Sequence, residues 1–385
     1  MPPLLPWLET TLVGAVVLVL LVAVLRLSFE SLLARLPVRL ALVALALAGV
    51  LGLALWRVGT PAQALFGVRV TWTLLIALAA VTLTLPIAAL LARGATASKT
   101  RGPERFTRRA LLQASSVSVP VAAAAGSLSG FEQARLPARL VPITVTFPDL
   151  PEDLDGFRIL HVTDVHLGAG CIHAEDLRSG LERALDSAPD LVVFTGDVAD
   201  HAGELRRALP MLESYPVPHG MYAALGNHEY FNGEEAIVEA YAASRVVLLV
   251  NEHAVLRVGS AKLQIFGVDD PIHHGPSVAY YREGLSRLAD AAEPDAFRLL
   301  LCHRPEGFDS ARQLGFHLTL AGHTHAGQLG LLGKSVFEVL LGRRYQWGLY
   351  REGQSVLYTS SGFGHWFPFR LNCPTELPLI TLRRG

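Results

Sequence analysis

The chain has 385 residues, of which 51% are hydrophobic and 17% charged, and its formal net charge is −1. This composition is too apolar for an ordinary soluble domain, and three widely spaced cysteines exclude both a disulfide framework and a thiolate metal knuckle. Charge divides the chain: residues 1–140 hold 13 Lys+Arg against 4 Asp+Glu, whereas residues 141–385 hold 20 against 30. All 14 histidines lie beyond residue 160. We therefore expect an N-terminal anchor or regulator and a C-terminal domain that carries the chemistry.

Three long apolar runs without a charged residue dominate the N-terminal part: Thr11–Leu25, Leu40–Trp56 and Trp72–Ala92. Each is near the roughly 17 to 25 residues that a membrane-spanning helix needs. Buried helices of a soluble domain are the alternative, but three such runs in sequence would leave no polar faces for water. Residues 1–92 are therefore predicted to form a transmembrane helical anchor.

The loops between these runs give an orientation, because basic residues mark the cytoplasmic side. Arginines gather in the first connection and again in residues 93–109, which predicts an out, in, out, in path. The residues TRRALL (107–112) and the weakly apolar stretch behind them resemble a twin-arginine export signal. A fourth membrane segment would reach the same side, whereas a basic loop leading to a cytosolic domain would not. Residues 93–139 are thus interpreted as a basic cytoplasmic loop with this signal, or a fourth membrane segment, and a linker.

This interpretation places the C-terminal domain on the extracytoplasmic side of the cytoplasmic membrane. It makes the lipid bilayer a lasting partner and the twin-arginine translocase a partner during export. Ala122 to Ala125 could be a cleavage site, and the sequence leaves cleavage open.

From residue 140 to 385 the sequence alternates β-branched or aromatic runs with amphipathic stretches, which is typical of an α/β layered domain. Helices are predicted at 174–187, 203–214, 233–243 and 281–291. Strands are predicted at 157–163, 190–196, 220–226, 262–268, 297–302 and 317–322.

Polar side chains stand directly after five of these strands, and we expect the five ends to meet at one edge, where α/β sheets build their sites. The motifs are DVH, GDVAD, GNHE, HRP and GHTH. They supply the following candidates in chain order: Asp164 and His166; Asp197 and Asp200; Asn227, His228 and Glu229; His303; His323 and His325.

The last motif places His323 and His325 one residue apart among glycines. Alternate residues of an extended segment point to opposite sides, but a glycine-flanked turn lets both imidazoles face inward. Two histidines so placed can serve two metal ions, provided that other residues complete each set of ligands.

The five motifs together resemble the calcineurin-like metallophosphoesterases, whose signature is D-x-H, G-D-x-x-D, G-N-H-[DE], a lone His and G-H-x-H. The residues GHTHAGQ, GVDDP and CPTELPLITL are most similar to the YkuE-type subgroup, which often carries twin-arginine signals. The resemblance covers about residues 140–384 and implies a four-layer αββα sandwich, here preceded by three or four transmembrane helices. It does not cover the three N-terminal helices, which simpler members of the subgroup lack.

The resemblance also implies a binuclear metal centre. Asp164, His166 and His325 would hold one ion, Asn227, His303 and His323 the other, and Asp197 would bridge them. Oxygen and nitrogen ligands without thiolate suit Mn, Fe or Zn rather than Ca. The implied reaction is in-line attack of a metal-bound hydroxide on a phosphoryl group.

Two further residues receive roles in this reaction. His228 would protonate or stabilise the leaving oxygen, and Asp200 would orient the site through a hydrogen bond. Glu229 is the alternative to Asp200.

The remaining histidines are interpreted as structural or as loop residues. The structural interpretation covers His161, His201, His219, His253 and His317, and His173, His273 and His274 lie in predicted loops. For His365, among aromatic residues, lining a substrate entrance and packing remain equal alternatives. The three cysteines, Cys171, Cys302 and Cys373, are interpreted as small buried residues.

The predicted function is a membrane-anchored phosphoesterase, with phosphodiesters of lipids, lipid-linked sugars or wall polymers as hypothetical substrates. A nuclease of the same fold is disfavoured because the C-terminal part is acidic and poor in lysine. A metal-binding membrane sensor or scaffold without chemistry is the alternative from a different class.

Overall fold

The computed structural model describes residues 73, 122–123, 125–168, 172–231, 233–272, 278–365 and 367–385. The three apolar runs lie outside these residues except for Thr73, and so does the paired-arginine motif. Within the part that is described, no helix is both long and apolar enough to cross a membrane. The residues from Glu132 to Gly385 form one compact unit.

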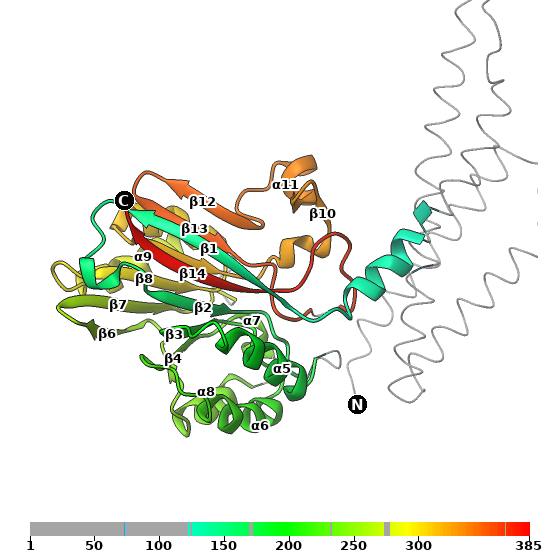
Figure 1. The fold of residues 1–385 in the computed structure, drawn as a ribbon, viewed down its shortest axis with the longest axis horizontal. Coiled ribbons are helices and arrows are strands. Elements are labelled where there is room, and N and C mark those ends of the chain that lie inside the picture. Colours follow the sequence, from blue (N-terminus) through cyan, green and yellow to red (C-terminus); the bar gives the residue numbers. More distant parts are fainter. Residues whose placement is uncertain are drawn as a thin grey trace, which may run out of the picture. The chain divides into compact units, whose positions relative to one another are not determined.

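Two six-stranded sheets make up the centre of this unit (Figure 1). The first contains, in spatial order, β1 (Arg139–Phe147), β14 (Glu376–Arg384), β2 (Arg158–Val162), β3 (Leu191–Thr195), β4 (Met221–Ala224) and β5 (Val247–Leu248). The second contains β12 (Gly348–Glu352), β13 (Ser355–Thr359), β9 (Leu318–Ala321), β8 (Phe297–Cys302), β7 (Ala261–Val268) and β6 (Glu252–Val258).

Most neighbouring strands in both sheets run parallel. In the first sheet only the β14–β2 pair is antiparallel. In the second sheet the two outer pairs, β12–β13 and β6–β7, are antiparallel, whereas β13, β9, β8 and β7 are parallel. The parallel strands bring the ends of β2, β3, β4, β8 and β9 to where the site is built.

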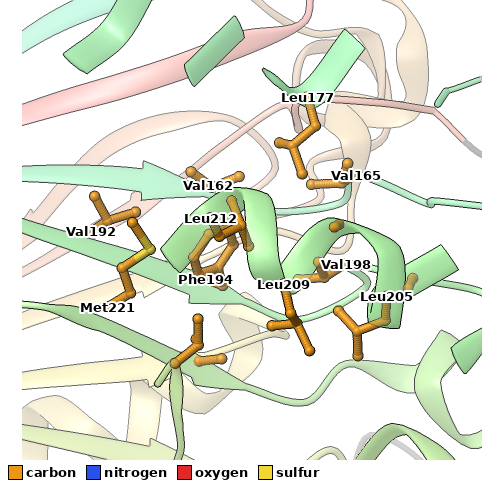
Figure 2. Close-up of a cluster of buried hydrophobic side chains, with 14 of the residues drawn as sticks. Val162, Val165, Leu177, Val192, Phe194, Val198, Leu205, Leu209, Leu212 and Met221 are labelled. Atoms are coloured by element: carbon orange, nitrogen blue, oxygen red, sulfur yellow. The ribbon is translucent and has the colours of Figure 1, made fainter. Parts of the chain in front are cut away.

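Helices cover the outer face of each sheet. The first sheet is covered by α5 (Ala174–Leu185), α6 (Ala202–Glu213) and α8 (Glu234–Ala242), which lie together beside β3 and β4 in Figure 1. Leu177, Leu205 and Leu209 of these helices belong to the same buried cluster as Phe194 of β3, which Figure 2 shows. The second sheet is covered by α9 (Val278–Asp290).

A third apolar cluster fills the space between the sheets. It joins Leu191 and Val193 of β3 to Ile265 of β7 and Leu299 of β8. Burying apolar side chains on both faces of a sheet is the main stabilising term for such a sandwich. The order helix, sheet, sheet, helix agrees with the predicted four layers.

Short elements complete the unit. They are the 3₁₀ helices η1 (Glu152–Leu154), η2 (Pro305–Gly307), η3 (Arg312–Leu314) and η4 (His325–Gln328), the helices α7 (Asn227–Phe231), α10 (Phe308–Ala311) and α11 (Val336–Leu341), and the hairpin strands β10 (Gly330–Leu331) and β11 (Lys334–Ser335).

All six predicted strands and all four predicted helices are present, with ends that differ by a few residues. One expectation needs correction. The five strands that carry the polar motifs do not share the edge of a single sheet, because β2, β3 and β4 belong to the first sheet and β8 and β9 to the second. The site therefore lies across the two sheets.

Candidate metal centre

The loops after β2 and β3 are joined by their backbones. The N–H of Asp164 donates to the carbonyl of Gly196 at 3.1 Å, and the N–H of His166 donates to the carbonyl of Asp197 at 3.0 Å. All three of these polar residues are buried. The two motifs D-x-H and G-D-x-x-D thus form one hydrogen-bonded layer.

Glycines precede several of the polar residues because a side chain would not fit there. A Cβ on Gly226 would lie 2.3 Å from Oδ1 of Asp197, and one on Gly322 would lie 2.0 Å from Oδ2 of Asp164. The glycines of GNHE and GHTH therefore let each backbone approach a carboxylate of another loop.

The backbone at the centre is held in the left-handed region. Asp164, His166, Asp197, His323 and His325 have φ values of 53°, 56°, 51°, 64° and 48°. Such conformations cost non-glycine residues about 1–3 kcal/mol each and persist where the surrounding structure fixes them, often at functional sites. The turn expected around GHTH is thus present, and both of its histidines face the centre.

Among the residues that the structure describes, three groups of side chains could each hold a metal ion, since their ligand atoms lie within 4.8 Å of one another. The first group is Asp164, His166 and His325, and the second group is Asp197, His303 and His323. The remaining group is His166, Asp200 and His228.

One carboxylate of the second group, that of Asp197, also faces the first group. Oδ2 of Asp197 is 3.2 Å from Nε2 of His303 and 3.8 Å from Nε2 of His166. Burial would raise the pKa of Asp197, but the nearby His303, His166 and His228 together outweigh burial and hold this pKa well below its usual range. An anionic oxygen is therefore available to both groups.

In His303 and His166, a hydrogen bond at Nδ1 leaves Nε2 as the ring nitrogen that faces the metal centre. Nδ1 of His303 lies 2.8 Å from the carbonyl oxygen of Thr195, to which it can only donate. Nδ1 of His166 lies 3.2 Å from Oδ1 of Asp200. Metal-ligating histidines usually make such a bond with the nitrogen that does not bind the metal, so Nε2 of each ring is the candidate ligand atom.

Two buried polar atoms at the centre lack a hydrogen-bond partner within the described residues: Oδ1 of Asn227 and Nε2 of His303. Such atoms are costly to bury. Oδ1 of Asn227 offers lone pairs to a cation, and Nε2 of His303 offers one when the ring is neutral with its proton on Nδ1. With buried carboxylates and imidazoles around them, the donor set is one that divalent transition metals prefer. The residues present therefore fit a divalent metal.

His228 lies at the open side of the centre. Its Nδ1 is 2.7 Å from Oδ1 of Asp200, and its ring is 25% exposed. Burial alone would lower the pKa of His228, but the hydrogen bond to Asp200 and the charge of Asp197 raise it above the ordinary value. The ring of Phe231, 61% exposed, lies 5.0 Å from the His228 ring between centroids.

Unlike Asp200, Glu229 contacts backbone N–H groups and not imidazoles. Its carboxylate accepts hydrogen bonds from the N–H groups of Asp197 at 2.9 Å, Val198 at 2.7 Å, Ala199 at 3.2 Å and Gly226 at 2.8 Å. Asp200 and Glu229, treated as alternatives above, thus do different things: Asp200 contacts two imidazoles, and Glu229 fixes the loop that carries Asp197.

Two arginines beside the centre were not identified from the sequence. Arg304 is paired with Asp270, with Nε 2.7 Å from Oδ2, and its Nη1 lies 2.8 Å from Nε2 of His323. The motifs HRP and GVDDP contain this pair. Arg370 is fully buried, with Nη2 3.0 Å from Nδ1 of His325 and Nη1 donating to the carbonyl of Ser361 at 2.7 Å.

The other histidines in the described residues join none of these groups. His161 is buried with Nε2 2.7 Å from Oγ1 of Thr195, and Nδ1 of His317 accepts from the N–H of Arg298 at 2.9 Å. His365 is buried, which favours packing over a substrate entrance. Cys302 and Cys373 are buried and free, as expected, whereas Cys171, His273 and His274 lie outside the described residues.

Comparison with known proteins gives concordant matches. Residues 157–327 match the family described as calcineurin-like phosphoesterase. The chain is similar to the metallophosphoesterase YkuE of Bacillus subtilis, with 29% identity over 61% of this chain and 82% of that protein. It is similar to the phosphodiesterase YaeI of Escherichia coli, with 27% identity over 59% and 82%. A transmembrane protein with metallophosphoesterase domain from Danio rerio is 29% identical over 66% of this chain, which spans 60% of that protein's length.

Proposed function

We propose that this chain, whose residues 157–327 match the calcineurin-like phosphoesterase family, is a metal-dependent phosphoester hydrolase. More specifically, we propose a membrane-anchored phosphodiesterase with two metal ions. Its substrates would be phosphoesters of lipids or of the cell envelope. The catalytic domain would lie on the extracytoplasmic side of the cytoplasmic membrane.

The position of Asp197 carries the proposal of two ions. Its Oδ2 faces a histidine of the first group and a histidine of the second group at once. In this assignment, the first group would hold one ion, and the second group together with Asn227 would hold the other, with Asp197 shared by both sets of ligands. A shared carboxylate offsets the repulsion between two neighbouring cations.

Bound divalent ions, Mn, Fe or Zn, would supply Lewis acidity toward the phosphoryl oxygens and lower the pKa of a water nucleophile. The protein's own residues would do the rest. Arg304 and Arg370 hold the rings of His323 and His325, and Glu229 holds the backbone at Asp197.

His228 is the proposed general acid. Oδ1 of Asp200 accepts a hydrogen bond from Nδ1–H of His228 and so favours the imidazolium form. Nε2–H of the same ring can then donate a proton to the leaving oxygen. Because the His228 ring is partly exposed, a leaving group can reach it without displacing a buried residue.

Three observations favour a lipid or envelope phosphodiester. The exposed ring of Phe231 beside His228 offers an apolar contact to a leaving group. The apolar runs of residues 11–92 predict a membrane anchor. Among similar proteins, one is named a phosphodiesterase and another a transmembrane protein.

The test uses the purified full chain, stripped with a chelator and reloaded separately with Mn, Fe or Zn. We expect metal-dependent hydrolysis of bis(p-nitrophenyl) phosphate that exceeds hydrolysis of the monoester. Absence of hydrolysis with every metal would leave the scaffold alternative, and faster cleavage of soluble monoesters than of envelope phosphodiesters would contradict the substrate class.

A further inference from the structure

An exposed apolar surface lies immediately after the GHTH motif. Six of the twelve large hydrophobic side chains that are exposed in the described part of the chain fall between residues 331 and 349. Leu332 is 93% exposed, and Leu340 and Leu341 are each 67% exposed. Several large apolar side chains exposed within one short segment indicate an interaction site rather than ordinary surface. We call the following residues the apolar patch: Leu331, Leu332, Val339, Leu340 and Leu341.

Two short elements present the patch. The turn between β10 and β11 carries Leu332, and α11 begins directly after β11. Oγ of Ser335 accepts from the N–H of Phe337 at 3.2 Å at the start of α11, and Gly342 ends the helix in the left-handed region. A helix of six residues is not stable alone, so packing must hold it in place. Figure 1 shows β10 and α11 projecting together beside β12 and β13.

The packing partner is the loop that carries the candidate ligands. Oγ of Ser335 donates to the carbonyl of Ala326 at 2.8 Å, and the ring of Phe337 covers Gly327 so closely that a Cβ there would lie 2.2 Å from it. Ala326 and Gly327 directly follow His325. The apolar patch and one side of the metal centre therefore form a single packed structure.

Basic residues border the patch. Lys334, Arg343 and Arg344 are exposed. Lys334 contacts Glu338 at 3.1 Å and Arg344 is paired with Glu352, so Arg343 is the basic residue of this border for which the described residues supply no ion pair. Apolar side chains flanked by Lys and Arg fit the boundary between acyl chains and anionic headgroups. The leucines are unfavourable on a surface that faces water, because the free energy of burying their apolar area is not gained there.

We propose that the apolar patch inserts into the headgroup–acyl boundary of an anionic lipid bilayer and so holds the metal centre at the membrane surface. The inference rests on the proposed membrane anchor, and it is independent of catalysis. A tethered domain without this contact would meet lipid phosphates only by diffusion on its linker. With the patch inserted, His323 and His325 stay close to the headgroups.

The direct test measures the surroundings of Leu332 in the full chain. A Leu332→Cys variant on a Cys171→Ser background is labelled with an environment-sensitive dye and reconstituted, one chain per nanodisc, in phosphatidylcholine with or without phosphatidylglycerol. Val247→Cys is the matched control, since Val247 is 42% exposed on β5. We expect a blue shift and quenching by spin-labelled lipid at Leu332, stronger with the anionic lipid, and neither at Val247.

Equal spectra at both positions would overturn the proposal, and so would a blue shift that appears only when two chains share a disc, since that would assign the patch to a second copy. A second variant, Leu332→Asp with Leu340→Asp, should lower hydrolysis of vesicle-borne phosphodiester about tenfold or more. Hydrolysis of soluble bis(p-nitrophenyl) phosphate should not change. If the wild-type chain hydrolyses neither substrate, the proposed function fails while the fluorescence result still decides the lipid contact.

Discussion

The first group and the second group of candidate ligands differ in how closely the protein surrounds them. Asp164, His166 and His325 are 0%, 0% and 3% exposed, and Arg370 lies behind them without any exposure. In the second group Asp197 and His303 are each 2% exposed, but His323 is partly exposed. Oδ1 of Asp197 accepts from the backbone N–H of His228, the partly exposed imidazole, at 2.8 Å. The first group is thus enclosed by protein, and the second group meets the side from which a substrate can approach.

This difference suggests a division of labour. An enclosed group loses rigidity when a buried neighbour is altered, whereas a group at the open side responds to residues that touch the substrate. Each prediction below tests one side of this comparison or the carboxylate that joins the two sides.

The largest effect is expected for Asp197→Asn, because this change removes a carboxylate charge that faces histidines of both groups. Hydrolysis should fall roughly 1000-fold or more, a barrier increase of about 4 kcal/mol. Metal analysis should show that ions are lost from both groups. Loss of a single ion with much of the activity retained would contradict the bridging role.

His228→Ala should lower kcat by about 100-fold or more, since a positioned general acid contributes at least this much. Metal content should stay nearly unchanged, as His228 lies outside the first and second groups. His253→Ala, an exposed histidine on β6, is the matched control and should keep full activity. A metal loss that parallels the activity loss would instead place His228 among the ligands.

Arg370→Lys keeps the charge behind the first group but loses the forked contacts to His325 and Ser361. Metal affinity should fall by about 10- to 100-fold, as expected when a group that orients a ligand is lost. Titration of the metal-free chain with Mn would measure it. An unchanged affinity would mean that the enclosed group does not depend on Arg370.

The smallest effect is expected for the pH dependence of folding stability, to which His161 contributes from the layer between the sheets. Burial lowers the pKa of His161 to about 3, so the unfolded chain takes up a proton first as the pH falls below 6.5. The stabilisation from the neutral ring is complete above pH 6.5 and is lost toward pH 3. Between pH 7 and 5 this loss is about 2 kcal/mol.

His161→Gln can keep the contact to Thr195 without titrating. The free energy of unfolding, measured in urea at pH 7 and at pH 5, should therefore fall about 2 kcal/mol less in this variant than in the wild type. An identical fall in both proteins would show that His161 does not set this pH dependence.

The sequence predicted the buried strands well and the outer strands poorly, for physical reasons. β3 and β8 are buried on both faces and read as continuous apolar runs. β1 contains Pro142 and is mostly exposed, and its partner β14 lies more than 200 residues along the chain. No local pattern reports that pairing, so β1 and β14 could not be assigned from sequence.

The same contrast between local patterns and distant contacts applies to the residues of the site. The five motifs sit at strand ends, so their meeting follows from parallel strands and short turns. Arg370 reaches His325 across 45 residues and comes from an irregular segment, so only the folded chain reveals the contact. The left-handed backbone at Asp164 and Asp197 could not be predicted from the sequence either, since no glycine stands at those positions.

Crystals of the Mn-loaded chain, measured at a wavelength where Mn scatters anomalously, would test the central claim most directly. The account predicts two anomalous peaks, one at the first group and one at the second group, with the Asp197 carboxylate between them. A single peak, or peaks away from Asp164, Asp197 and His325, would contradict it.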